Sequence, residues 1–182
     1  MTRGAYNVVV KRLTSLVYAA LLAGLAVGCA AAQTDDTLGT LLHFRKCLLS
    51  AELQAVYERP AKAEGRGRFL TMTVTDRPVA FVQCMVADGA VICEASAFDR
   101  GTEANKTPLP PQSVAALQRL GFAIGTGGEN LSYERAFRGK PDFDSIAVLM
   151  LTALHDAYGL HAETDVDTYA PFAGSMVVAC RY

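Results

Sequence analysis

The chain has 182 residues, a formal net charge of −1 and 51% hydrophobic residues, which suits one domain with a sizeable core. It has no basic run or stripe, so nucleic acid is not an expected partner. Gly-x-Ser-x-Gly, Ser-x-x-Lys and His-Glu-x-x-His motifs are missing from the sequence, and we therefore expect no enzyme, no cofactor and no metal.

The first 28 residues have the pattern of a secretory signal peptide. Arg3, Lys11 and Arg12 form a basic region, and residues 13–28 form an uncharged apolar run that ends in small residues. The alternative is a permanent membrane helix, but the run is shorter than the ~20 residues that spanning requires.

Two cleavage sites fit this signal. The segment that ends in Gly28-Cys29 resembles the lipobox of bacterial lipoproteins, in which the cysteine is acylated, although leucine is usual where Ala26 stands. This reading predicts a lipoprotein anchored in the membrane of the cell envelope through Cys29. Ordinary cleavage before Gln33 would instead give a soluble periplasmic or secreted protein.

Residues 29–37 are small and polar and are expected to form a tether or the lead-in to a helix, followed by a single domain over residues 38–182. Leucines recur at helical spacing from Leu38 to Tyr57, which predicts an amphipathic helix that ends before Pro60. Arg68 to Val74 alternates in the manner of a strand.

The segment from Val79 to Phe98 is the centre of the predicted sheet. Two apolar runs flank Asp88-Gly89, a strong signal for a two-residue hairpin turn. That turn sets Cys84 opposite Cys93 in a closely spaced cross-strand pair, where a disulfide can form.

The hairpin has two different faces. The wholly apolar face is expected to pack on helices and comprises Ala80, Val82, Cys84, Val86, Val91, Cys93 and Ala95. The other face comprises Phe81, Gln83, Met85, Ile92, Glu94 and Ser96. Gln83 and Glu94 are polar in an otherwise apolar hairpin, so this face is either a recognition surface for a peptide, with Phe81, Met85 and Ile92, or an ordinary solvated face.

Four cysteines remain beside the lipobox cysteine, and an exported chain meets an oxidising compartment. Four cysteines allow three pairings. The hairpin register favours Cys84–Cys93, which leaves Cys47–Cys180 as a second candidate disulfide. The alternative is that these cysteines are free and act as small buried hydrophobic residues.

The second half of the chain mixes helices and strands. We expect a loop from Asp99 to Pro111, a short helix ending before Gly121 and a strand over residues 130–138. A further helix is expected to be capped by Asp142 or Asp144 and to end at Gly159. A polar tail from His161 to Thr168, with acidic residues Glu163, Asp165 and Asp167, precedes a last strand over residues 175–180. The class is therefore α+β, with an antiparallel sheet of about four to six strands packed against helices. The element order is α-β-β-β-α-β-(β)-α plus a C-terminal strand.

Four segments carry a resemblance to a known family: FVQCMVADGAVICEASAF, LPPQSVAALQRLGF, LSYERAF and IAVLMLTALHDAYGL. Together they resemble the YbjN-like, type III secretion chaperone-like superfamily (TY-Chap-type domain) over residues 38–160. The resemblance implies a helix–three strand–helix–strand–helix fold and a non-enzymatic binding module, often dimeric. Members are commonly cytoplasmic, so the export signal, the cysteine pairs and residues 161–182 set this chain apart.

The leading functional hypothesis is therefore a chaperone-like or adaptor-like module of the bacterial cell envelope. It would engage a protein or peptide partner through sheet and helix surfaces, and a homodimer is compatible with it. The alternative is a small-ligand sensor with a pocket beside Phe81, Met85 and Ile92. A third hypothesis is thiol chemistry at Cys47, which nothing else in the sequence supports. His43 and Cys47 share a helix face, but two ligands do not make a zinc site.

Overall fold

The computed structural model describes residues 33–59, 68–87, 89–102, 104–125, 130–171 and 180, with residues 33–37 described only in their backbone. The description below concerns the compact unit over residues 38–182. The predicted signal peptide, Cys29, Asp88 of the hairpin turn and the predicted strand before Cys180 lie outside the described residues.

The helices and strands follow the predicted α+β order broadly. The helices are α2 (Gln33–Glu58), α3 (Pro111–Arg119) and α4 (Phe143–Tyr158). The strands are β1 (Phe69–Val74), β2 (Arg77–Ala87), β3 (Ala90–Ser96), β4 (Phe98–Thr102), β5 (Asn105–Pro108), β6 (Ala123–Ile124), β7 (Asn130–Ala136) and β8 (Val166–Tyr169). Six strands form one antiparallel sheet in the order β6-β7-β3-β2-β1-β8, and β4 and β5 form a separate ribbon.

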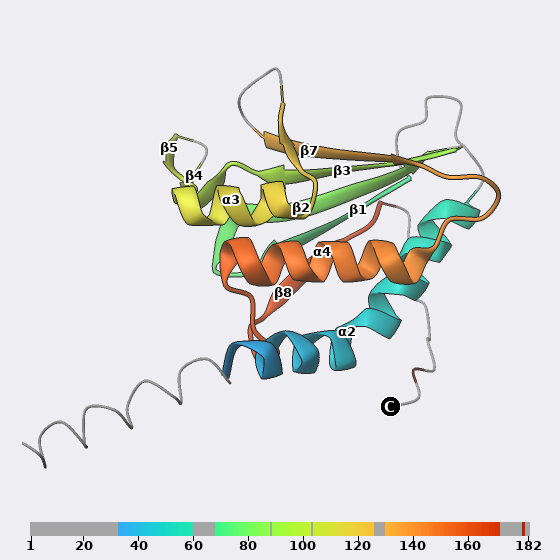
Figure 1. Cartoon of the computed structure of the whole chain (residues 1–182), viewed down its shortest axis with the longest axis horizontal. Helices are drawn as coiled ribbons and strands as arrows, with labels where there is room; N and C mark the ends of the chain where they lie inside the picture. The colour runs from blue at the N-terminus through green and yellow to red at the C-terminus, as the bar shows by residue number, and fades with distance from the viewer. Residues whose placement is uncertain are drawn as a thin grey trace, which may run out of the picture. The chain divides into compact units, whose positions relative to one another are not determined.

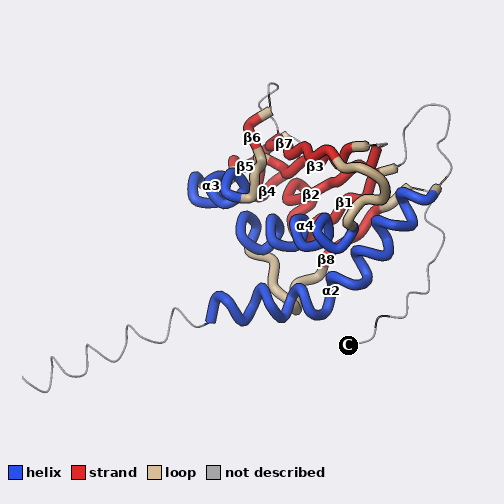
Figure 2. Tube along the Cα trace, turned by 45° about the vertical axis from the view of Figure 1, so that its right-hand side comes forward, coloured by secondary structure: helices blue, strands red, loops and turns tan. Residues whose placement is uncertain are grey.

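The described helices lie on one side of the sheet. Figures 1 and 2 show α4 beneath the sheet, with α2 below it and α3 beside the end of β3. Every second residue of β2 faces this side, so Val82, Cys84 and Val86 have no exposed surface. Leu53 of α2 and Leu154 of α4, also fully buried, belong to the same core. The predicted orientation of the hairpin is therefore confirmed.

The register of the central hairpin is also confirmed. Cys84 pairs with Cys93, and Ala87 pairs with Ala90 next to the turn. Gly89 has φ +88°, a conformation that a side chain would disfavour. The structure joins Cys84 to Cys93 by a disulfide on the buried face, with the two Cα atoms 4.0 Å apart.

Ser96 differs from the prediction, which placed it with Gln83 and Glu94 on the accessible face of the hairpin. It is 1% exposed, because β3 ends there and the chain bends into β4. Its hydroxyl accepts a hydrogen bond from the backbone N–H of Phe98, and its carbonyl oxygen accepts one from the Tyr158 hydroxyl at 2.5 Å. Arg77 completes this network by donating to Asp99 and to the carbonyl oxygen of Tyr158.

Two other predictions are corrected. The loop expected from Asp99 to Pro111 contains most of the β4–β5 ribbon, whose side chains are largely exposed and so show no hydrophobic alternation. The polar tail expected from His161 to Thr168 contains most of β8, which pairs with β1 at the edge of the sheet. Three of its four residues are exposed, so an edge strand can have a polar sequence.

The boundaries of α4 follow the predicted signals. The carboxylate of Asp142 accepts a hydrogen bond from the backbone N–H of Ser145, and Gly159 ends the helix with φ +66°.

Among the described residues, none of the helices is both long and apolar enough to cross a membrane.

Candidate functional site

The predicted recognition residues share the face of the sheet that points away from the described helices. Gln83 lies opposite Glu94, and Met85 lies opposite Ile92. Glu94 is exposed, and Phe81, Gln83, Met85 and Ile92 are half-buried. The structure therefore brings the five predicted residues together on one surface, which we call the open face.

The open face is organised in cross-strand rows. One row is polar and runs through Thr71, Gln83, Glu94 and Ser132, with a 2.8 Å hydrogen bond from the Thr71 hydroxyl to the side-chain oxygen of Gln83. The neighbouring row begins with Phe69, Met85 and Ile92 and ends at Glu134. The ligand-sensor hypothesis expected a pocket beside Phe81, Met85 and Ile92. These three residues face away from the helices, so they cannot line a pocket between the sheet and the helices.

A groove of about 490 Å³ lies on the other side of the sheet, between β7 and α4. Its apolar part includes Leu120 after α3, Tyr133 and Phe137 in and after β7, and Ile146 and Leu149 of α4. These residues come from three separate segments, each of which resembles ordinary core sequence. Sequence reasoning missed this groove for that reason.

The outer edge of β7 borders the groove and is only partly paired. On that side β6 pairs with Leu131 and Ser132, and the remaining described residues form no partner strand for Tyr133–Ala136. The N–H of Phe137 donates inward to Gly89, while the carbonyl oxygen of Asn130 accepts from Gly125 on the outer side. Alternation of the ladder therefore turns the N–H and C=O groups of Glu134 and Ala136 outward.

Charged side chains stand at one end of this groove. Arg135 is exposed and points to the helix side of the sheet, because it pairs with the buried Val91. Hydrogen bonds from Ser145 lower the pKa of Asp142, and the charge of Arg135 lowers it further. Lys140 lies 3.4 Å from a carboxylate oxygen of Glu58.

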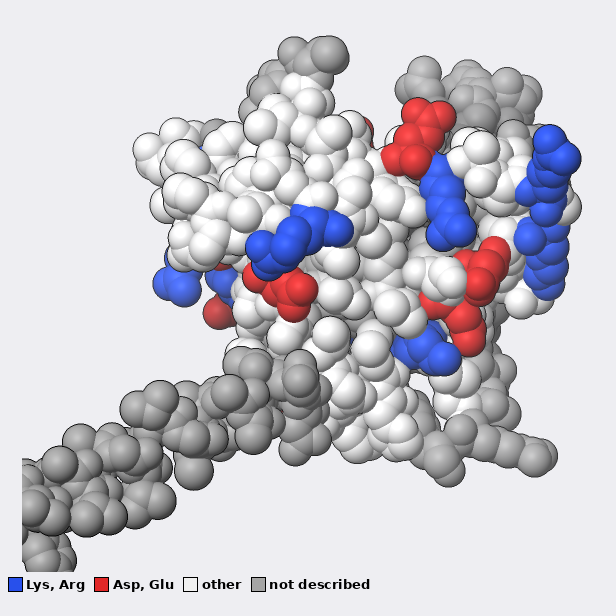
Figure 3. All heavy atoms as spheres, viewed as in Figure 1, with Lys and Arg blue, Asp and Glu red and all other residues white. Residues whose placement is uncertain are grey.

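The space-filling view shows the same division. In Figure 3 the surface above α4, toward β7, is mostly white. Most of the Lys, Arg, Asp and Glu side chains on this face lie toward its right-hand end, with a smaller group at the left. The groove thus combines an apolar centre, backbone groups of β7 that no described strand pairs along one wall, and ionic groups at one end. This combination suits an extended polypeptide better than a reacting substrate.

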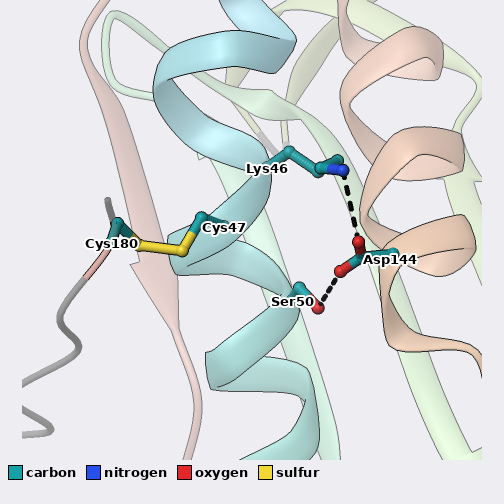
Figure 4. The surroundings of a disulfide bond; sticks show 5 residues. All are labelled: Lys46, Cys47, Ser50, Asp144 and Cys180. Atoms are coloured by element: carbon teal, nitrogen blue, oxygen red, sulfur yellow. Dashed lines mark hydrogen bonds and ion pairs between the residues drawn. A yellow bond between two sulfur atoms is a disulfide. The ribbon is translucent and has the colours of Figure 1, made fainter. Parts of the chain in front are cut away.

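A second cleft, between α2 and α4, lies near the Cys47–Cys180 disulfide. Figure 4 shows that Lys46 and Ser50 face Asp144 on α4, while Cys47 points to the other side of α2. Lys46 lies 3.2 Å and Ser50 lies 2.6 Å from the carboxylate of Asp144. The hydrogen bond from Ser50, then that from Lys46, lowers the pKa of Asp144. These polar groups join two helices, and the disulfide leaves Cys47 no free thiol for nucleophilic chemistry.

No group of three or more His, Cys, Asp or Glu side chains gathers in a metal-binding arrangement within the part of the chain that the structure describes. His155 and His161 stack edge to face 5.9 Å apart, and His155 contacts Asp156 at 2.7 Å. The third histidine, His43, lies on α2, where its ring contacts that of Phe44.

Comparison with known families places the chain. The family model TY-Chap3, described as T3SS (YopN, CesT) and YbjN peptide-binding chaperone 3, matches residues 49–170, about two thirds of the chain. The protein therefore belongs to this family of peptide-binding chaperones, as the resemblance in its sequence indicated. The match includes β8 and ends before Cys180. Neither a curated protein nor a solved structure was found to match the chain.

Proposed function

We propose that this protein is a non-enzymatic chaperone-like or adaptor-like module that holds an extended segment of another polypeptide along β7. The single observation that carries the proposal is the edge of β7 from Tyr133 to Ala136, which no strand among the described residues pairs and which lies beside an apolar groove. Backbone groups at a free strand edge bind a peptide independently of its sequence, and the adjacent groove receives alternate side chains. Membership of a peptide-binding chaperone family supports the same reading.

We further propose that the protein works in the bacterial cell envelope as a lipoprotein anchored at Cys29. The signal-like residues 1–28 support this location, and the two disulfides are compatible with an oxidising compartment. Mass spectrometry of the mature N-terminus tests it. An acylated Cys29 is expected, whereas an unmodified Gln33 at the N-terminus would contradict the anchor.

The proposal includes a homodimer formed through the open face. Phe69, Met85 and Ile92 give this face an apolar centre, and the polar row through Gln83 and Glu94 lies beside it. Sedimentation of the wild type and of a Met85→Glu variant tests the dimer, which the charged side chain should dissociate. A wild-type protein that sediments as a monomer at all concentrations would contradict it.

A small-ligand sensor is the second candidate, because the groove volume falls within the range of small-molecule sites, roughly 300–1,000 Å³. A compact apolar ligand would contact Leu149 and Tyr133 but would not need hydrogen bonds from the outer backbone groups of β7. Preventing those hydrogen bonds should therefore weaken peptide binding without weakening the binding of a small ligand.

The experiment that tests peptide binding compares two charged substitutions on an array of random decapeptides. Leu149→Asp changes the groove, and Met85→Asp changes the open face. If the groove holds the peptide, only Leu149→Asp lowers binding, while both variants retain the circular dichroism of the folded protein. Loss of binding in Met85→Asp alone would place the site on the open face and contradict the proposal.

A further inference from the structure

The exposed cation in the wall of the groove indicates which peptides fit. We propose that β7 binds, as an antiparallel strand, a segment with an acidic residue opposite Arg135 and an apolar residue opposite Tyr133. This inference rests on the proposed peptide-binding function and adds the direction and the side-chain pattern of the bound segment.

The direction follows from the sheet. Every paired strand in the described part of the sheet is antiparallel to its neighbour, and antiparallel pairing is the more stable arrangement per residue. An added antiparallel strand would exchange two hydrogen bonds with Glu134 and two with Ala136, whose N–H and C=O groups turn outward. β6 already pairs with Leu131 and Ser132, so the added strand must end opposite Tyr133.

The side-chain pattern follows from the register. Tyr133 and Arg135 lie on the helix side of β7, so the residues opposite them also point toward α4 and into the groove. The apolar position would contact Leu149 and the ring of Tyr133, which is half-buried. Arg135 is exposed, and its charge already acts on Asp142 at the same end of the groove. An acidic residue directly across the ladder adds a cross-strand attraction for its guanidinium.

These requirements give a short motif. In an antiparallel strand the residue opposite Arg135 comes first, and the residue opposite Tyr133 comes two positions later. The bound segment therefore reads acidic–x–apolar from its N-terminus to its C-terminus. A neutral or basic residue in the first position loses the cross-strand attraction or replaces it with repulsion.

Synthetic peptides test this motif by fluorescence anisotropy. The probe is a labelled Thr-rich nonapeptide that contains Asp-Thr-Val, and it is compared with versions that carry Asn or Lys in place of Asp and with the reversed order Val-Thr-Asp. The Asp-Thr-Val probe should bind the wild type roughly three- to tenfold more tightly than the Lys version, and more tightly than the reversed order.

A charge exchange provides the matched control. Arg135→Glu should reverse the preference so that the Lys probe binds more tightly than the Asp probe. Arg138→Glu makes the same change of charge at an exposed position outside the lining of the groove and should leave the preference unchanged. If all probes bind the wild type equally, the motif is wrong while peptide binding stands. If none of the probes binds, both the motif and the proposed site are contradicted.

Discussion

The hydroxyl of Tyr158, in the last turn of α4, donates a 2.5 Å hydrogen bond to the carbonyl oxygen of Ser96 at the end of β3. Tyr158 is 2% exposed, and its burial, together with the nearby charge of Asp99, raises the pKa of its phenol. The bond therefore joins the helix layer to the sheet inside the core. It also satisfies a carbonyl group at the point where β3 bends into β4.

Removing this hydroxyl should destabilise the fold. Tyr158→Phe keeps the ring but leaves the buried carbonyl of Ser96 without that donor, which should cost about 1–2 kcal/mol of unfolding free energy. Urea denaturation followed by circular dichroism measures the change. Tyr169→Phe is the matched control, since Tyr169 is 61% exposed, and it should change stability by less than about 0.5 kcal/mol.

The two disulfides should be reduced in a fixed order. Cys47 and Cys180 are half-buried, whereas Cys84 and Cys93 have no exposed surface. A reductant must reach a sulfur atom before exchange can occur, so Cys47–Cys180 should open first under native conditions. Differential alkylation with peptide mapping measures the order. Equal rates, or earlier modification of Cys84, would contradict the placement of that disulfide in the core.

The contact of Asp144 with α2 should make stability depend on pH at its acidic end. The pKa of Asp144 is lowered in the folded protein, so its contribution is present above the ordinary value of 3.8 and is lost as the pH falls through the folded value. Asp144→Asn should therefore cost about 0.5 kcal/mol at pH 7, as expected for an exposed pair, and nothing at pH 2. Asp167→Asn, at an exposed position on β8, is the matched control and should change stability at pH 7 by less than about 0.5 kcal/mol.

Glu52 on α2 should have the opposite effect. Burial raises the pKa of its carboxyl group, so the folded protein favours the protonated form. The stability that comes from keeping this carboxyl group protonated is complete below the pKa of Glu52 in the unfolded chain. It is lost as the pH rises through the pKa of Glu52 in the folded protein. Glu52→Gln should therefore stabilise the protein at pH 7 by a few tenths of a kcal/mol, because solvent screens a half-exposed group. Thermal unfolding at pH 7 and pH 3 checks this, with Glu163→Gln as an exposed control.

The sequence predicted the elements whose local signals agree with their packing. Asp142 and Gly159 mark the ends of α4 as expected, and the hairpin register that pairs Cys84 with Cys93 follows from a two-residue turn. These features depend on residues close together in the chain.

The features that the sequence did not predict depend on long-range contacts. β8 is recognisable only by its pairing with β1, since its residues are largely polar. The groove requires Leu120, Tyr133 and Leu149 to meet in space, and no local pattern records that meeting. The sequence placed the open-face residues on one face of the sheet because they alternate along one hairpin. Their alternation does not indicate that the groove lies on the opposite side of the sheet.

A bound peptide should pair with the outer edge of β7, and residue-resolved amide hydrogen exchange tests this pairing most directly. In the free protein the amides of Glu134 and Ala136 should exchange rapidly, while those of Tyr133 and Arg135, which face β3, should be protected. Saturation with the Asp-Thr-Val nonapeptide should protect Glu134 and Ala136. If the peptide is bound and both amides still exchange rapidly, the β7 edge is not the binding site.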